Sequence, residues 1–286
     1  MKSVNWVIKD LETPYLVTMA SGRHYPFRWH HHDDYELFAP VRGTGHALVG
    51  DSMSEFVPGQ VYFMAPALAH AFYTMPAAVP PPKGRKAYVL NLAPALLANP
   101  VFGQAAEILR QQAIRGVLYT GAAAAELVKA IVGLQTAQGL MALETLVHLL
   151  AVLERQTPRF LASPNWASPL DKKTSRRMDA VFTFLHTHYT ADVRLASVAE
   201  VAHLGPVPFC RLFKRITNKT LVEYLNELRV GHACRLLLES ELSITEVALA
   251  SGYNTLSNFN RMFHRQKHIS PRAWRQRASK MNGRKT

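Results

Sequence analysis

The sequence predicts an α+β protein with two domains, the first a small β-barrel or sandwich followed by helices and the second entirely helical. Three observations predict this class. Up to about residue 92, short apolar runs alternate with turns; residues 95–156 are rich in Ala and Leu; and residues 176–286 carry a succession of helical patterns. Residues 157–175 contain three prolines and few periodic apolar positions, so we expect a semi-rigid interdomain linker there.

The first region carries clear strand signals. Three strands are predicted, at Leu37–Val41, His46–Val49 and Val61–Met64. Turn-forming residues separate them, at Gly43–Gly45, Gly50-Asp51 and Pro58-Gly59. Strands this short and this evenly punctuated favour a barrel or a sandwich over a parallel sheet.

The Ala- and Leu-rich region predicts helices over Ala122–Leu134 and Leu140–Glu154. The second helix places five apolar residues on one face: Leu143, Leu146, Val147, Leu150 and Leu153. Such a stripe packs against the helix's own domain or forms a seam between two copies of the chain.

Positive charge is concentrated in the helical domain. The chain carries 33 Lys and Arg against 20 Asp and Glu, a net charge of +13. Residues 176–286 hold 18 of the basic and 8 of the acidic residues, a net of +10, and no acidic residue follows Glu246. This asymmetry favours an anionic polymer as the partner of the C-terminal domain. The alternative is a solvated basic tail, especially for the last six residues.

Several classes of protein are excluded by composition. The two cysteines, Cys210 and Cys234, both fall inside predicted helices, so a disulfide framework or a Cys-based zinc site is excluded. The N-terminus lacks the apolar stretch of a secretory signal, and no apolar run reaches the roughly 20 residues that span a bilayer. We expect a cytoplasmic protein that does not enter membranes.

A repeated segment indicates what the helical domain does. Phe209–Arg215 recurs as Phe259–Arg265, both with the pattern Phe-x-Arg-apolar-Phe-basic-Arg. A repeat of this kind marks a supersecondary unit used twice. Each copy follows a short helix and a turn, so the units are predicted helix-turn-helix motifs that read double-stranded DNA, over 195–216 and 245–266. The phenylalanines fall on one face and should be core, whereas Arg211 and Arg261 point elsewhere and can bond guanine or phosphate.

Helix boundaries in this domain are well marked. Ser243 and Glu246 form a capping box, Gly252 suits the left-handed position that ends a helix, and Thr255 can cap the next one. Ser270-Pro271 begins the last helix. The long helix Leu221–Glu239 is predicted to space the two recognition helices about one DNA turn, roughly 34 Å, apart.

Residues 178–277 resemble the C-terminal domain of the AraC/XylS family of bacterial transcription regulators. The resemblance rests on motifs spread over about a hundred residues: Phe209–Arg215, Tyr224–Arg229 with Ala233, Leu236 and Leu237, Ser243–Ala248, Ser251–Tyr253, Ser257–Phe263 and Ser270–Arg275. It implies two motifs that enter successive major grooves. By position, the implied base-reading residues are Val207, Cys210, Arg211, Leu256, Ser257, Asn258 and Arg261. The implied phosphate-binding residues are Lys214, Arg215, Arg265 and Lys267.

The sequence departs from the family at several positions. Asn218 and His268 stand where the family has Gly, and Gly205 stands where it has a small or polar cap. Asn tolerates the left-handed conformation, so the first departure is mild. Two prolines stiffen the start of the first recognition helix and Val207 is apolar, so we expect the first motif to read fewer bases than the second.

A histidine-rich stretch in the first domain suggests a sensor. His30 and His32 are two apart, as residues on one face of a strand are, and with Glu36 and His70 they could supply three imidazoles and one carboxylate. The arrangement resembles the cupin barrel, which many AraC-type regulators use as a sensor. Spacings around Gly59, Pro66 and His70 differ by one residue from the metal-binding cupin pattern. We expect an effector pocket formed by His30, His32, Glu36 and His70 without a metal; a bound divalent metal and purely structural histidines remain alternatives.

The leading hypothesis is a transcription regulator, not an enzyme, whose N-terminal domain (residues 1–156) binds a small effector and whose C-terminal domain (residues 176–286) binds promoter DNA. The resemblance implies a bacterial, nucleoid-associated homodimer that pairs through helices within residues 95–156 and that contacts RNA polymerase if it activates. The alternative is a metal-dependent cupin enzyme, a dioxygenase or isomerase, fused to a DNA-binding domain. A third hypothesis, nonspecific DNA compaction, is disfavoured by the uncharged Ser257 and Asn258 at the start of the second recognition helix.

Overall fold

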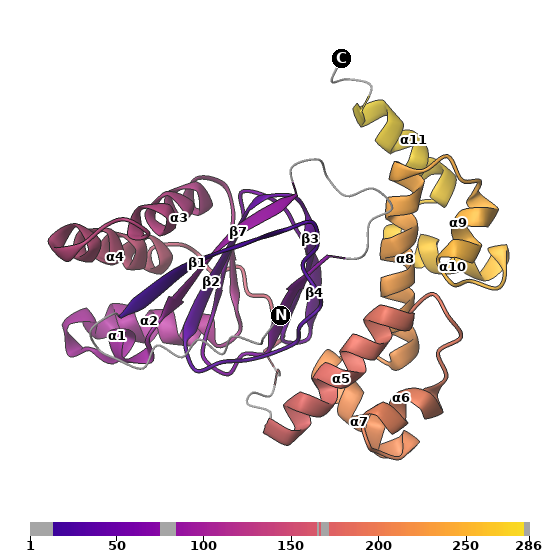
Figure 1. The fold of residues 1–286 in the computed structure, drawn as a ribbon, viewed down its shortest axis with the longest axis horizontal. Coiled ribbons are helices and arrows are strands. Elements are labelled where there is room, and N and C mark those ends of the chain that lie inside the picture. The colour runs from indigo at the N-terminus through magenta and orange to yellow at the C-terminus, as the bar shows by residue number, and fades with distance from the viewer. Residues whose placement is uncertain (1–13, 75–83, 165, 167–171, 283–286) are drawn as a thin grey trace. The chain divides into compact units, whose positions relative to one another are not determined.

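The computed structural model of the chain describes residues 14–74, 84–164, 166 and 172–282 (Figure 1). These residues divide into two compact units, one within residues 14–172 and the other beginning at residue 173. Among the described residues, the strands lie in the first unit and the second unit consists of helices.

Two antiparallel sheets form the first unit. The larger has the order β1 (Tyr15–Gly22), β7 (Arg85–Leu92), β2 (Tyr35–Arg42), β5 (Val61–Met64) and β8 (Val117–Tyr119). The smaller has the order β4 (Ser52–Phe56), β3 (Gly45–Val49) and β6 (His70–Tyr73). The three strands predicted from the sequence are β2, β3 and β5, with ends that differ by at most a few residues.

The predicted barrel is not closed. Among the described residues no ladder joins the two sheets, so this part of the prediction is wrong and the unit is an open two-sheet sandwich. Closure needs paired strands around the whole circumference. Here β1 and β8 are the edge strands of the larger sheet and β4 and β6 those of the smaller one, and in the described part of the chain none of these edges pairs with the other sheet.

Strands β2 and β5 of the larger sheet are buried on both faces: side chains alternate along each strand, and each of the two sets packs into a core. Phe38, Tyr62 and Met64 face a core that also includes Val49 and Phe56 of the smaller sheet. Their neighbours Leu37, Val61 and Phe63 belong to a separate core shared with helices. The strand predicted at residues 37–41 therefore presents apolar side chains on both of its faces.

Helices cover the outer face of the larger sheet (Figure 1). They are α1 (Pro94–Ala98), the 3₁₀ turn η1 (Pro100–Phe102), α2 (Gly103–Ala113), α3 (Gly121–Leu134) and α4 (Gly139–Glu154). The stripe predicted on α4 divides, because Leu146, Leu150 and Leu153 are buried in this core whereas Leu143 and Val147 are exposed.

Two features of this region were not anticipated. Strand β8 lies between α2 and α3, within the stretch predicted to be helical. The chain after α4 returns to this strand, since Leu118 N donates to Arg159 O and Leu161 N donates to Gly116 O, each at 2.9 Å. Residues 159–162, expected in the linker, are therefore part of the first unit.

Seven helices form the described part of the second unit: α5 (Lys172–His188), α6 (Leu195–Val201), α7 (Pro206–Thr217), α8 (Leu221–Glu239), α9 (Ile244–Ala250), α10 (Leu256–Lys267) and α11 (Pro271–Asn282). Helix α8 runs through the unit, and the other helices flank it at both ends (Figure 1). It buries residues around most of its circumference, including Tyr224, Leu228, Val230 and Leu237.

The caps predicted from the sequence are present. Ser243 and Glu246 form a capping box, and Thr255 accepts a hydrogen bond from Asn258 N. A second box, Thr220 with Glu223, opens α8 and was not anticipated. Asn218 and His268, which stand where the family has Gly, both adopt the left-handed conformation, with φ of 54° and 58°.

Gly252 joins the second motif to the loop after α5. Its φ is +84°, and a Cβ there would lie 2.8 Å from the Thr190 backbone. Gly121 in the first unit also has a positive φ, +63°, but nothing lies within 4 Å of the place that a Cβ would take there. Of these two glycines, only Gly252 therefore combines conformational strain with a close approach.

We expect Gly252→Ala to destabilise the helical unit more than Gly121→Ala destabilises the first unit. The left-handed backbone alone costs about 1–2 kcal/mol for an L-residue. Displacing the Thr190 backbone should add about 1–3 kcal/mol at Gly252. Hydrogen exchange of the helices and strands, measured for each variant, reports the stability of each unit separately. Equal losses in the two variants would show that the contact with Thr190 contributes nothing.

Candidate nucleic-acid interface and histidine cluster

The first motif consists of α6, a short turn and α7. Phe209 and Phe213 are buried, as predicted. The predicted readers Val207, Cys210 and Arg211 are all exposed. Val207, Arg211 and Arg215 line one hollow of about 330 Å³ on α7, so predicted base and phosphate contacts share a face. Gly205 caps α7 without a side-chain hydrogen bond, and His203 takes the left-handed position in the turn.

The second motif consists of α9, a turn at Gly252 and α10. Phe259 and Phe263 are fully buried, whereas the predicted readers Leu256, Ser257, Asn258 and Arg261 are exposed. One guanidinium nitrogen of Arg261 donates to Asn258 Oδ1 at 3.1 Å. Because Asn258 also donates its backbone N–H to the cap residue Thr255, these two predicted readers are held together at the capped end of the helix.

The four predicted phosphate-binding residues differ in their surroundings. Lys214 and Arg215 are exposed at the end of α7, and Arg265 is exposed on α10. Lys267 is only half-exposed, and its Nζ lies 5.3 Å from the centre of the Trp274 ring, in a cation–π contact. Lys267 is therefore held by α11, unlike the other three.

The two motifs are tied together through α8. Arg229 donates to Tyr189 O at 2.6 Å and to Ala191 O at 2.9 Å, which fixes the loop after α5. Its guanidinium lies 5.8 Å from the centre of the Tyr253 ring, and the Tyr253 hydroxyl donates to Asn226 Oδ1 at 3.0 Å. Sequence patterns assigned no role to Arg229 or Asn226, because their partners are long-range.

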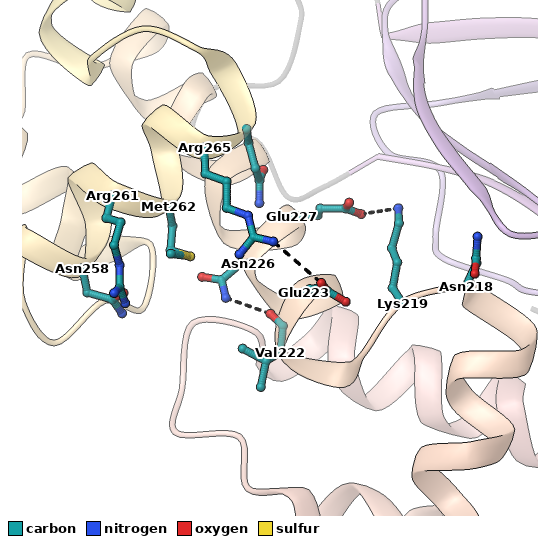
Figure 2. Close-up of a pocket in the computed structure, with 11 residues that line it drawn as sticks. Asn218, Lys219, Val222, Glu223, Asn226, Glu227, Asn258, Arg261, Met262 and Arg265 are labelled. Atoms are coloured by element: carbon teal, nitrogen blue, oxygen red, sulfur yellow. Dashed lines mark hydrogen bonds and ion pairs between the residues drawn. The ribbon is translucent and has the colours of Figure 1, made fainter.

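A cleft of about 740 Å³ lies between the end of α7 and the exposed face of α10 (Figure 2). Asn258, Arg261 and Arg265 line it from α10, and Asn218 and Lys219 line it from the other side. The first turns of α8 supply the remaining wall, including Glu223 and Glu227. The cleft thus brings predicted base-reading and phosphate-binding residues next to two carboxylates.

The four residues predicted to form the sensor site come together in the first unit. One ligand atom each from His30, His32, Glu36 and His70 lies within 4.8 Å of the others. The rings of Phe38 on β2 and Phe72 on β6 stack between the sheets, with their centroids 3.8 Å apart. Glu36 precedes Phe38 by two residues, and His70 precedes Phe72 by two. His30 pairs with His70 through two backbone hydrogen bonds. The cluster therefore sits where the two sheets face each other.

Backbone carbonyls orient two of the imidazoles. His70 Nδ1 lies 2.8 Å from Leu68 O, and His30 Nδ1 lies 3.1 Å from Arg28 O. A carbonyl only accepts, so each Nδ1 carries a proton, and in a neutral ring the lone pair is then on Nε2. His70 Nε2 is buried 3.4 Å from Glu36 Oε1, but it makes no hydrogen bond. When the His70 ring is neutral, this nitrogen offers its lone pair to a cation beside the carboxylate.

The charges in the cluster follow from burial and proximity. Burial alone would raise the pKa of Glu36, but the neighbouring His70 and His32 outweigh it and hold that pKa well below the usual range. Burial alone would lower the pKa of His32, but its 2.9 Å contact with Glu36 outweighs it and raises the pKa. Partial loss of hydration, together with His70, lowers the pKa of His30 to about 4. A carboxylate and a neutral imidazole are thus present at neutral pH.

This donor set fits a divalent transition metal. Three imidazoles and one carboxylate suit zinc, iron, manganese or nickel. Ligand bonds of about 2.0–2.2 Å place opposite ligand atoms at most about 4.4 Å apart. The present spread of 4.8 Å therefore needs only a small closure of the side chains.

Comparison with known proteins matches the helical unit. Residues 198–277 match the family described as "Helix-turn-helix domain". The MmsAB operon regulatory protein of Pseudomonas aeruginosa is 30% identical over 112 residues, which are 39% of this chain and 36% of that protein. The transcriptional activator RhaS of Shigella boydii is 32% identical over 105 residues, 37% of this chain and 38% of its own. The chain thus spans little more than a third of the length of these curated relatives.

Two solved structures illustrate the similarity further. The DNA-binding domain of AdpA, in complex with a target DNA, is 29% identical, covers 34% of this chain and 86% of its own, and has a TM-score of 0.33. Apo ToxT from Vibrio cholerae is 14% identical, covers 92% of this chain and 97% of its own, and has a TM-score of 0.38. Scores this low support no inference about the arrangement of the fold.

The helical unit is a double helix-turn-helix domain, with two capped or proline-started recognition helices on one central helix. Within that class, it is a domain of the AraC/XylS type of transcriptional regulators, as its sequence motifs and its curated relatives agree. Among the residues that the structure describes, no helix is both long and apolar enough to cross a membrane.

Proposed function

We propose that the whole protein is a sequence-specific transcription regulator that binds double-stranded promoter DNA through α7 and α10 and is not an enzyme. The observation that carries the proposal is the repeated arrangement of an exposed arginine, Arg211 or Arg261, between two buried phenylalanines on each recognition helix. A guanidinium so placed can bond guanine in the major groove. The curated relatives, which are transcription regulators, support this interpretation.

The second motif should carry most of the sequence specificity. On α10, Asn258 and Arg261 are joined by a hydrogen bond and present a polar end. Paired polar groups of this kind discriminate bases by their donor and acceptor patterns. On α7 the corresponding end carries Val207 and two prolines, which offer fewer hydrogen bonds to base edges.

In vitro selection of random duplexes should return a site with two parts about one helical turn apart. We expect Arg261→Ala to weaken binding to that site by about 1–3 kcal/mol and to relax preference at one position. Arg110→Ala removes the same charge from a partly exposed position of the first unit and should leave the preference unchanged. If Arg261→Ala binds the selected site as the parent does, Arg261 is not a reader.

We further propose that the first unit is the sensor and that His30, His32, Glu36 and His70 hold a divalent transition metal in it. The buried Nε2 of His70 and the ionised Glu36 support a cation at this place. The aromatic rings packed between the sheets, Phe38 on Phe72 at 3.8 Å among them, favour a small ligand over a large one. A bound ion would supply the positive charge that the buried carboxylate otherwise draws from the histidines. Metal or effector binding here would act on DNA binding by favouring one conformation of the protein.

Elemental analysis of untagged protein, after incubation with Zn²⁺, Fe²⁺, Mn²⁺ or Ni²⁺ and desalting, should find about one metal ion per chain. His30→Ala removes an exposed ligand, and we expect it to weaken the binding by at least about 10–100-fold, as calorimetric titration would measure. His24→Ala is the control, since His24 is exposed and lies outside the cluster. Clearly less than one metal ion per chain after incubation with each of the four ions would contradict the proposed metal site. The cluster would then be a metal-free effector pocket or a set of structural histidines.

We propose that two copies of the chain pair through the exposed side of α3 and α4. Leu140, Met141, Leu143 and Val147 of α4 are exposed, with Leu140 at 82%. A groove of about 630 Å³ between the two helices is lined by groups of both signs, including Glu126, Lys129 and Glu144. A two-fold interface uses the same patch twice, so it needs such self-complementary charge around an apolar centre.

The double variant Leu143→Glu with Val147→Glu should raise the dimer dissociation constant by at least about tenfold, because it places four carboxylates in the apolar centre of the dimer. Sedimentation velocity across a concentration series measures this constant. Val101→Glu is the control, since Val101 is 78% exposed on the same unit but lies outside this patch. A parent protein that is monomeric at all concentrations would contradict the interface.

A further inference from the structure

The cleft between the two motifs contains two carboxylates in an otherwise basic surface. Glu227 lies 2.7 Å from Lys219 Nζ, and both side chains are about three-quarters buried, so this pair is a fixed part of the wall. Glu223 faces Arg265 across the cleft at 3.9 Å (Figure 2). Arg265 and Glu223 are 69% and 48% exposed, so this second pair is accessible and can open.

Glu223 is held in place independently of Arg265. It is the N3 residue of the capping box of α8, and its Oε2 accepts hydrogen bonds from the Thr220 N–H and hydroxyl, each at 2.9 Å. Its other oxygen, Oε1, is the one that faces Arg265. The carboxylate therefore needs no further ordering to meet this cation, which removes part of the entropy cost that weakens most surface ion pairs.

The cleft lies in the path of bound DNA if the proposed function holds, on which this inference rests. Asn258 and Arg261 on its wall are the proposed readers of α10, and Asn218 and Lys219 lie at the end of α7. A duplex that contacts α10 along the cleft brings phosphates close to Arg265. Arg265 lies one helical turn after Arg261, on the same face of α10. A fixed carboxylate at this place competes with phosphate for the same guanidinium.

We propose that Glu223 regulates phosphate contact: it holds Arg265 across the cleft and so withholds one cation from sequence-independent binding to DNA. Nonspecific binding depends almost wholly on the number of phosphates neutralised. Specific binding also draws on base contacts, which offset the loss of one ion pair. The carboxylate therefore lowers the share of the affinity that comes from phosphate contact and does not depend on sequence, and it does so from a helix that carries none of the proposed base-reading residues.

The test uses Glu223→Gln in the full chain. Glutamine at N3 preserves a capping box, so the variant removes the charge without removing the cap. Glu246→Gln is the matched control, because Glu246 is the N3 residue of the equivalent box on α9 and forms no ion pair among the described residues. Both variants change the net charge by the same amount. Each is also made in an Arg265→Ala background.

We expect Glu223→Gln to tighten binding to a duplex without the selected site by about two- to fivefold at low salt. The slope of log K against log salt concentration should steepen by up to about one, the value for one more phosphate contact. Glu246→Gln should change neither quantity. In the Arg265→Ala background, Glu223→Gln should also change neither, since its effect passes through that arginine.

Equal slopes for Glu223→Gln and Glu246→Gln, or an effect of Glu223→Gln that persists without Arg265, would overturn the role of Glu223. Unchanged thermal melting of Glu223→Gln separates the electrostatic effect from a loss of structure. A parent that shows no preference for its selected site would instead remove the proposed function itself. The two failures are thus distinguishable within one titration series.

Discussion

The packing of α8 is the constraint on which the helical unit depends. A helix of 19 residues with buried side chains around most of its circumference is fixed against rotation and sliding. Arg229 adds directional contacts, because its two hydrogen bonds to the Tyr189 and Ala191 carbonyls fix the loop after α5. That loop in turn meets Gly252 so closely that a methyl group would not fit. The turn of the second motif is therefore held against the end of α5, and the two recognition helices form parts of one body.

The same helix makes the surface between the motifs chemically mixed. Its first turn must be capped, and the capping box brings Glu223 to the wall of the cleft. The cap thus places a negative charge on the surface that is proposed to bind DNA, which is itself negatively charged. Arg265 offsets this charge by its ion pair with Glu223, and Lys219 does the same for Glu227 on the same helix. Local helix chemistry and long-range electrostatics act here on the same carboxylate, and a substitution to glutamine separates them.

In the first unit, too, a carboxylate determines the electrostatics of the candidate site, and here it is buried. Glu36 lies in the sheet interior beside His32 and His70, and backbone carbonyls fix a proton on Nδ1 of His30 and His70, so that a neutral ring keeps its lone pair on Nε2. An anion and lone pairs gathered out of water are costly unless a cation joins them. This cost is the physical reason to favour a metal, and it becomes visible only when the four residues are seen together. From the sequence, the altered spacing around His70 had favoured a pocket without metal.

Periodic patterns and caps determined the parts of this protein that depend on neighbours in sequence. The seven helices of the second unit, the buried phenylalanines of both motifs and the caps at Ser243 and Thr255 were all predictable, because each follows from contacts within about four residues. The sequence also determined the family, since its motifs extend over the whole helical domain. Tertiary structure decided what depends on distant residues. The open sandwich, strand β8 and the division of the α4 stripe into buried Leu150 and exposed Leu143 follow from which surfaces meet. The link from Arg229 to Tyr189 and the contact of Glu223 with Arg265 join residues about 40 apart, and no local pattern records such a pairing because the chain brings them together only on folding.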